Sequence, residues 1–234
     1  MMDFQQAESI FVENGLEYSR ELHEKLEIYC DFLVEYNQNV NLTAITEPCE
    51  VWLKHFADSI LLLKHIDIPE NSSLIDIGTG AGFPSVPVKI YRNDIKLTML
   101  DSLNKRIVFL EKLCEKLGIE AECLHGRAEE YGKKEALREQ FDFATARAVA
   151  AMPTLCEYCM PFVKKGGSFV AMKGPNENAD DAVHAVQTLG GKDIKVIDYT
   201  LGKDESRKIF SVRKISHTPT KYPRNSGQIK NKPL

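Results

Sequence analysis

An apolar run leads directly into a glycine-rich loop in Leu74-Ile75-Asp76-Ile77-Gly78-Thr79-Gly80-Ala81-Gly82-Phe83-Pro84. The run predicts a buried parallel strand, and the residues after the loop predict the start of a helix. Glycines at alternate positions let the turn adopt positive φ and let a ligand approach the backbone. A second predicted strand, Lys96–Leu100, ends at Asp101, about twenty residues after the loop. An acid in this place can accept hydrogen bonds from both hydroxyls of a ribose, so the two features together indicate a nucleoside cofactor.

The spacing of the glycines favours one kind of nucleoside. Dinucleotide folds use Gly-x-Gly-x-x-Gly, in which the third glycine packs the helix close and the helix N-terminus holds a pyrophosphate. In this chain the spacing is Gly-x-Gly-x-Gly, and Phe83 and Pro84 follow it. That spacing resembles the first motif of class I S-adenosylmethionine-dependent methyltransferases, whose cofactor has no phosphate to hold. We therefore expect S-adenosyl-L-methionine as the cofactor.

Composition indicates an ordinary soluble protein. The 234 residues suit one domain with additions, and the contents of 43% hydrophobic and 27% charged residues are typical of globular chains. No apolar run approaches the roughly 20 residues that span a membrane, and the acidic, polar first ten residues do not form a signal peptide. Six cysteines lack a framework spacing, so we expect a cytoplasmic protein with reduced thiols and no membrane partner.

Charge is distributed unevenly along the chain. The net charge is only −4, but residues 1–60 hold twelve acids against three Lys or Arg, a balance of −9. Residues 201–234 hold nine Lys or Arg against two acids, a balance of +7. The basic end can touch phosphates while the acidic end faces elsewhere; the alternative is a solvated tail.

Three regions follow from the pattern of apolar residues. Residues 1–66 are helical and form an N-terminal cap, and Pro48 can open a second helix there. Residues 67–214 alternate short apolar runs with helices, which predicts a Rossmann-like parallel α/β domain. Its predicted strands are Leu74–Ile77, Lys96–Leu100, Glu120–Leu124, Phe141–Ala146, Ser168–Met172, Ile194–Tyr199 and Ile209–Val212. Residues 215–234 are rich in Pro, Lys and Asn, which predicts an extended or disordered basic tail.

Several segments together resemble one family, the bacterial RsmG family, also called GidB or glucose-inhibited division protein B. Its members are 16S ribosomal RNA guanine-N7 methyltransferases. The resemblance runs from about residue 30 to the end of the chain. The segments that carry it are Asn41-Leu42-Thr43-Ala44-Ile45, His55-Phe56-Ala57-Asp58-Ser59, Asp76 to Pro84, Asp101 to Arg106, Gly126-Arg127-Ala128-Glu129, Thr145 to Val149, Lys173-Gly174, Tyr222-Pro223-Arg224 and Pro233-Leu234. One small departure is Ser85-Val86-Pro87, where many relatives have Gly-Ile-Pro.

The resemblance implies the fold, the cofactor and the substrate. It implies a class I methyltransferase sheet of about seven strands whose last strand inserts antiparallel. It implies N7 of guanine 527, in the 530 loop of 16S rRNA on the small ribosomal subunit, as the methylated atom. The cofactor-binding residues expected on this basis are Asp76, Gly78, Thr79, Gly80, Gly82, Phe83, Asp101, Ala128, Glu129 and Arg147.

The chain lacks the motifs of other classes of methyltransferase, and this agrees with methylation at guanine N7. Guanine N7 carries an in-plane lone pair and no proton, so it can attack the methyl group directly without a general base. Catalysis then rests on positioning and exclusion of water, which can lower the barrier by about 7–11 kcal/mol. After the fourth strand the chain has Thr145-Ala146-Arg147-Ala148-Val149, without the Asn/Asp-Pro-Pro-aromatic motif of exocyclic-amine enzymes or a nucleophilic Cys. The alternative is a small-molecule methyltransferase with the same fold.

Arg147 is the leading candidate for a positioning role. Its guanidinium fork can bond the cofactor carboxylate, a phosphate or guanine O6, and the alternative is a salt bridge to a structural acid such as Asp142. His55 and Asp58 lie three residues apart on one helix face, where they can shape the target pocket together with Asn41, or simply pack.

The remaining candidates are cations and cysteines. Cations that can grip rRNA phosphates are Lys105, Arg106, Lys173, Arg207, Arg213, Lys221 and Arg224. Each of these can equally be a solvated surface charge. Cys156 and Cys159 form a Cys-x-x-Cys without a second pair, so we interpret them as partly buried thiols and expect no metal. We expect a monomer.

Overall fold

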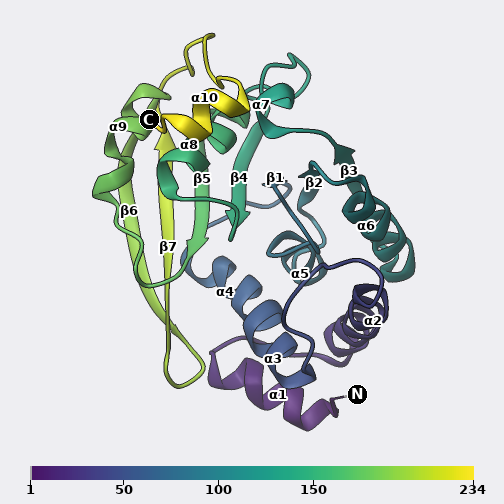
Figure 1. Ribbon diagram of the computed structural model, residues 1–234. Coiled ribbons are helices and arrows are strands. Elements are labelled where there is room, and N and C mark those ends of the chain that lie inside the picture. The colour runs from purple at the N-terminus through teal and green to yellow at the C-terminus, as the bar shows by residue number, and fades with distance from the viewer. Residues whose placement is uncertain (1) are drawn as a thin grey trace.

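A single sheet organises residues 2–234, the part of the chain that the computed structural model describes. Its strands are β1 (Ser73–Ile77), β2 (Lys96–Asp101), β3 (Ala121–His125), β4 (Phe141–Arg147), β5 (Val163–Lys173), β6 (Gly191–Leu201) and β7 (Glu205–Lys214). They lie in the order β3-β2-β1-β4-β5-β7-β6, and β7 runs antiparallel to both of its neighbours (Figure 1). The expected Rossmann-like sheet with an antiparallel last strand is confirmed.

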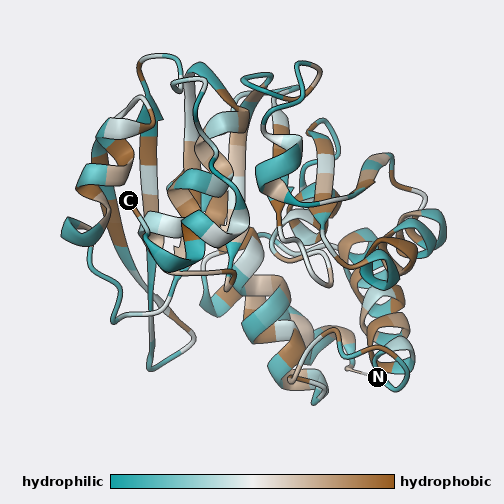
Figure 2. Ribbon diagram, turned by 45° about the horizontal axis from the view of Figure 1, so that its top comes forward, coloured by the Kyte–Doolittle hydropathy of each residue, from teal (hydrophilic) through white to brown (hydrophobic). Residues whose placement is uncertain are grey.

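The helices cover the two faces of the sheet. They are α1 (Phe4–Glu13), α2 (Arg20–Asn37), α3 (Pro48–Val51), α4 (Asp58–His65), α5 (Ser85–Tyr91), α6 (Asn104–Leu117), α7 (Ala128–Tyr131), α8 (Met152–Cys159), α9 (Val183–Thr188) and α10 (Ser226–Asn231). Helices α2, α4, α5 and α6 pack on one face, and α8 packs with α7, α9 and α10 on the other. Apolar residues line the strands and the inner sides of these helices (Figure 2).

Helix ends follow the sequence signals closely. Helix α6 ends at Leu117, and Gly118 adopts the left-handed conformation, φ +60°, that terminates a helix favourably. Pro48 occupies the first turn of α3, as predicted. A π-helical turn, Trp52–Ala57, then joins α3 to α4. None of the helices described in residues 2–234 is long and apolar enough to cross a membrane.

The N-terminal helices share their hydrophobic core with the sheet domain. Leu26 and Phe56 belong to the same buried cluster as Val86 of α5 and Leu110 of α6. The tip of the β6–β7 hairpin also reaches α1, where the Gly202 amide donates to the Asn14 side chain at 3.0 Å. The helical cap therefore packs on the sheet domain, and the expected boundary between the two at residues 66 and 67 stays a prediction.

The C-terminal segment is folded, contrary to the expectation of an extended or disordered tail. Ile229 of α10 is fully buried, and so is most of Tyr222. The Arg224 guanidinium makes paired hydrogen bonds to the carboxylate of Glu157, which is itself fully buried in α8. Arg224 was expected to face solvent or RNA because its buried acidic partner, Glu157, lies far away in the sequence.

Lys214 at the end of β7 is buried for a similar reason. Its ammonium donates to the carbonyls of Met160 and Val163 and to the hydroxyl of Thr218, and it lies 3.1 Å from a Glu139 oxygen. Burial lowers the pKa of this amine to about 8, although Glu139 opposes the shift. Two of the cations in residues 201–234, Lys214 and Arg224, thus hold the C-terminal segment in place.

Candidate active site

The glycine loop leaves the carboxyl end of β1 in the conformation that its spacing predicts. Gly78, Gly80 and Gly82 have φ of +68°, +62° and +96°. The Gly78 amide donates to the Leu100 carbonyl of β2 at 2.8 Å, which fixes the loop against the neighbouring strand. A Cβ on Gly78 would lie 2.9 Å from a methyl group of Val149, so conformation and space both require glycine here.

Asp76 supports the loop from below and keeps one oxygen free. The hydroxyls of Thr79 and Ser85 donate to its Oδ2 at 2.8 Å and 2.6 Å, whereas the buried Oδ1 has no hydrogen-bond partner among residues 2–234. Burial raises the pKa of Asp76 to about 7, against the opposing effect of the two hydroxyls. A buried carboxylate oxygen without a donor fits the ammonium group of the expected cofactor. Ser85, the departure from the commonest family pattern, is therefore one of the two donors to this carboxylate.

Asp101 ends β2 beside the same loop. Its carboxylate accepts from the Gly80 amide at 3.0 Å, the Leu103 amide at 2.9 Å and the Arg106 guanidinium at 3.2 Å. The side chain is almost fully buried, so these donors hold it at a fixed place over the loop. Asp101 thus lies where an acid can bond a ribose, and Arg106 points to Asp101 rather than away from the protein.

A small cavity of about 150 Å³ opens between the loop and α7. Its wall contains Gly78, Ala128 and Glu129, three of the residues expected at the cofactor. Ile77, Leu100 and Val149 give it apolar sides that suit a flat heterocycle. The loop, Asp76, Asp101 and this cavity together fit S-adenosylmethionine.

A larger cavity of about 380 Å³ lies on the other side of the β4 end. It is lined by Ile45, Lys54, His55, Asp58, Arg147, Ala148, Met172, Lys173, Gly174, Tyr199 and Arg207. Ala148 has φ +57°, in the left-handed region that costs a residue with a side chain about 1–2 kcal/mol. Arg147 and Ala148 line the larger cavity, and Val149 lines the small one. Segment 147–149 therefore separates the two cavities.

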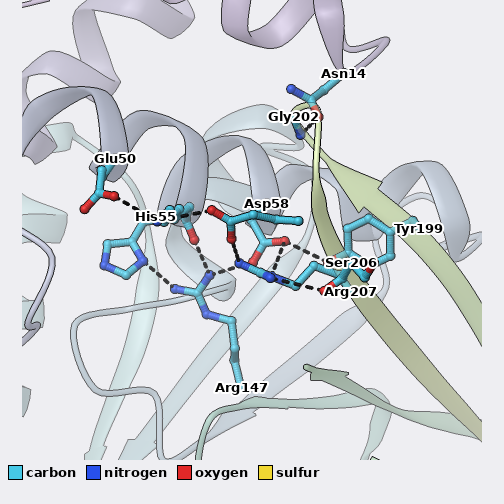
Figure 3. A network of polar contacts seen from close by, with 11 residues as sticks. Asn14, Glu50, His55, Asp58, Arg147, Tyr199, Gly202, Ser206 and Arg207 are labelled. Atoms are coloured by element: carbon cyan, nitrogen blue, oxygen red, sulfur yellow. Dashed lines mark hydrogen bonds and ion pairs between the residues drawn. The ribbon is translucent and has the colours of Figure 1, made fainter. Parts of the chain in front are cut away.

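Arg147 connects β4 to the N-terminal helices. Its guanidinium donates to Asp58 Oδ2 at 3.2 Å and to the Lys54 carbonyl at 3.1 Å, and it lies 3.1 Å from His55 Nδ1 (Figure 3). It also lies over the Phe83 ring, 4.9 Å from the centroid. The structural acid that pairs with Arg147 is Asp58, and Asp142 bonds Ser73 and Lys164 instead.

Asp58 is the centre of this set of contacts, which we call the Arg147 network (His55, Asp58, Arg147 and Tyr199). It is almost fully buried, and its Oδ1 accepts from the Tyr199 hydroxyl of β6 at 2.7 Å. Burial and the nearby Asp58 raise the pKa of Tyr199 far above neutrality, so this hydroxyl stays a donor. One carboxylate therefore joins α4, the end of β4 and the β6–β7 hairpin.

His55 is held as one neutral tautomer. Because a guanidinium only donates, Nδ1 of His55 accepts from Arg147, and Nε2 then donates to the Thr43 hydroxyl at 2.8 Å. Burial and the adjacent Arg147 lower the pKa of His55 to about 3. The ring stacks on Phe83 with centroids 4.4 Å apart, so it forms a wall between the loop and the larger cavity.

Comparison with known proteins agrees with this geometry. The family model described as rRNA small subunit methyltransferase G matches residues 22–209. The curated relative named ribosomal RNA small subunit methyltransferase G from Alkaliphilus metalliredigens is 47% identical over 215 residues, which are 90% of each chain. The relative of the same name from Lactobacillus acidophilus is 46% identical over 227 residues, covering 94% of this chain and 95% of its own.

The chain belongs to the rRNA small subunit methyltransferase G family.

Solved structures of more distant proteins share the fold alone. A SAM-dependent methyltransferase from Aquifex aeolicus has a TM-score of 0.52 at 18% identity and covers 71% of this chain and 93% of its own. A geranyl diphosphate methyltransferase in complex with SAM has a TM-score of 0.54 at 12% identity, covering 68% and 85%. The predicted methyltransferase architecture is thus confirmed, and the expected cofactor agrees with it.

The cations that this family member was expected to use on RNA do not form one surface. Lys173 and Arg207 line the larger cavity. Arg106 is bound to Asp101 and Arg224 to Glu157, so both guanidinium groups are engaged by buried carboxylates of the protein. Lys105, Arg213 and Lys221 are exposed at separate places on α6, on β7 and before Tyr222. Their contact with RNA stays a prediction.

Sequence reasoning missed Tyr199 and Lys54, which line the larger cavity, and Glu205, which contacts Lys54. Tyr199 contacts Asp58 across 141 residues of sequence, and Glu205 contacts Lys54 from the start of β7. A pattern along the chain carries no signal for such pairs. Asn41, expected near the target, does not line the larger cavity. Within residues 2–234 no group of three or more His, Cys, Asp or Glu side chains could hold a metal ion.

Proposed function

We propose that this protein transfers the methyl group of S-adenosylmethionine to N7 of a guanine, position 527 of the 530 loop, in the 16S rRNA of the small ribosomal subunit. Membership of the rRNA small subunit methyltransferase G family supports the ribosomal substrate. The observation that carries the proposal is the pair of cavities on either side of the β4 end. One fits the cofactor, and the other can receive a base beside it.

The cofactor side is assigned from the groups that the loop brings together. Asp76 Oδ1 would accept from the cofactor ammonium, Asp101 would bond the ribose, and the small cavity with Ala128 and Glu129 would take the adenine. S-adenosylmethionine supplies a methyl group on a sulfonium, which a nucleophile can attack directly. The chain's task is to hold this group still and to exclude water from it.

The target side contains no free general base, which agrees with attack by an unprotonated N7. His55 is neutral at neutral pH, but both of its ring nitrogens are engaged, by Arg147 and by Thr43. Asp58 is bound by Arg147 and Tyr199. A reaction that needed proton abstraction would call for a base with an open lone pair in this cavity. Guanine N7 needs only alignment with the methyl group.

Asp58 also explains how the cation Arg147 can lie beside a guanine that becomes positively charged on methylation. A guanidinium next to the methylated base would repel the positive charge that develops there. The Asp58 carboxylate lies 3.2 Å from the Arg147 guanidinium and balances the charge of Arg147. The planar face of the guanidinium still lies over the Phe83 ring. Arg147 can therefore position groups at the junction of the two cavities without opposing the reaction.

Labelled methyl transfer to ribosomal particles tests the proposal. Small subunits from cells that lack this gene, and subunits from wild-type cells as control, would be incubated with the protein and radiolabelled S-adenosylmethionine. We expect label in the 16S rRNA of the deficient subunits only. Cofactor binding without label in either preparation would contradict the ribosomal substrate and favour the alternative, a small-molecule methyltransferase, which a panel of small acceptors would then test.

A further inference from the structure

Glu205 lies between two cations, Lys54 and Arg207, that line the larger cavity. Its Oε1 is 3.1 Å from Lys54 Nζ, and its Oε2 contacts the Arg207 guanidinium. Lys54 comes from the π-helical turn before α4, whereas Glu205 and Arg207 come from β7. Figure 3 shows how Arg207 also approaches Asp58, with Nε 4.0 Å from Oδ1. One carboxylate thus joins cations from two distant parts of the chain.

This cluster is open to ligands from solvent, unlike the Arg147 network behind it. The side chains of Lys54, Glu205 and Arg207 are 27%, 35% and 24% exposed, whereas that of Asp58 is 5% exposed. Ion pairs with this exposure contribute little to stability because water screens them and solvates the separated partners. Lys54 also keeps a second acid, Glu50, at 2.8 Å. Glu205 can therefore leave the two cations at small cost.

The two cations match the oxygens of a phosphodiester as well as those of a carboxylate. Guanidinium and ammonium groups bind phosphate through short, charge-assisted hydrogen bonds. Lys54 and Arg207 both line the larger cavity, where the proposed target base would enter. A base in that cavity remains joined to its backbone, so a phosphate beside it would reach the two cations that Glu205 contacts.

We propose that Lys54 and Arg207 form a binding site for a backbone phosphate of the RNA beside the target nucleotide, and that Glu205 occupies this site until RNA displaces it. The inference rests on the proposed function, because the RNA substrate comes from there. Glu205 is then a built-in competitor that weakens RNA binding and keeps two converging cations paired in the free protein. Contacts with Lys54 and Arg207 hold the pKa of Glu205 below its usual range although burial opposes them, so the competitor is charged.

Equilibrium binding of cofactor-loaded protein to methylation-deficient small subunits, measured at several salt concentrations, tests the site. Glu205→Gln should bind about three- to tenfold more tightly than the wild type, because the phosphate no longer competes with a carboxylate. Lys54→Gln and Arg207→Gln should bind more weakly by a similar factor. Each should also reduce the slope of log K against log salt by about 0.7 to 0.9, the loss of one phosphate contact. Lys54→Arg should restore the wild-type affinity.

Glu21→Gln is the matched control. Glu21 forms an exposed pair with Lys25 at 2.9 Å on α2, so this change removes the same charge elsewhere. Glu205→Gln binding no more tightly than Glu21→Gln, with thermal midpoints unchanged, would overturn the inference, because Glu205 would then not compete with RNA for the two cations. A failure of the wild-type protein to methylate the same subunits would instead refute the proposed function, so the two failures are distinguishable.

Discussion

The glycine loop and the Arg147 network lie on opposite sides of the β4 end, and they are assembled from very different lengths of chain. Asp76 receives its hydrogen bonds from residues three and nine positions away, and Gly80 reaches Asp101 across 21 positions. Arg147 meets Asp58 across 89 positions, and Tyr199 meets Asp58 across 141. The cofactor side is therefore largely local, whereas the target side exists only when the helices, β4 and the β6–β7 hairpin have come together.

This contrast suggests how the two sides respond to change. Local contacts in the loop form with β1 and β2, so damage there affects the cofactor first. The Arg147 network joins three elements through one buried carboxylate, so damage there affects both folding and the alignment of the base.

Asp58→Ala should have the largest effect. It leaves the Arg147 guanidinium partly buried beside no anion, and removal of one partner of such a pair costs about 3–5 kcal/mol. We expect a lower thermal midpoint and a large fall in kcat, with a near-normal Kd for S-adenosylmethionine. Calorimetry and single-turnover transfer to deficient subunits would measure this. A parallel loss of cofactor affinity would show that the two sides are not separable.

Gly78→Ala should damage the cofactor side. The left-handed backbone costs about 1–2 kcal/mol for alanine, and the added Cβ would lie 2.9 Å from Val149. We expect the Kd for S-adenosylmethionine to rise by on the order of tenfold or more. Gly118→Ala is the control, because it has φ +60° and open space around it. Equal effects of the two changes on cofactor Kd would refute a specific role for the loop.

Asp76 should make cofactor binding depend on pH. Burial raises its pKa to about 7, so the folded protein binds a proton more tightly than the unfolded chain. This contribution to the stability of the free protein is full in acid and is lost as pH rises through about 7. Because a cofactor ammonium needs the charged carboxylate, affinity should instead rise over the same interval. Titration calorimetry from pH 6 to 8 would find this trend in the wild type, and its persistence in Asp76→Asn would argue against Asp76 as its source.

Tyr199→Phe should have the smallest effect. It removes the hydroxyl that donates to Asp58 at 2.7 Å but keeps the ring, so stability should fall by about 1–3 kcal/mol at most, since one acceptor site of Asp58 is left unpaired. The Arg147–Asp58 pair remains, so kcat should fall only a few-fold. Comparison with Asp58→Ala in the same assays checks the order; a larger loss in Tyr199→Phe would place the centre of the network at Tyr199.

The sequence predicted the regular parts of the fold because their signals are local. All seven strands were expected, with boundaries that differ from the observed ones by a few residues, as for Glu120–Leu124 against β3. The helix Asn104–Leu117 and its stop at Gly118 were predicted as observed. The conformation of the loop was predicted from the alternate spacing of its glycines, and all three adopt the expected positive φ.

What the sequence did not reveal depends on partners that are far away along the chain. The order of residues gives no sign that Glu157 lies buried under Arg224, 67 positions later, so the C-terminal segment was expected to be unfolded. Arg147 was expected to bond the cofactor carboxylate or a phosphate, and the alternative, a structural acid, was exemplified by Asp142; the acid that it contacts is Asp58. Lys54 and Glu205 were overlooked, because only the folded hairpin brings their side chains together.

The identity of the methylated atom tests the central claim most directly. After reaction with deficient small subunits, the 530-loop fragment of the 16S rRNA would be isolated, digested to nucleosides and analysed by mass spectrometry against synthetic methylated guanosines. The two-cavity arrangement without a free base predicts 7-methylguanosine, formed once per subunit. A methyl group on the exocyclic amine or on a ribose hydroxyl would require proton removal at the site. It would contradict the claim that His55 and Asp58, both engaged by Arg147, leave no free base in the larger cavity.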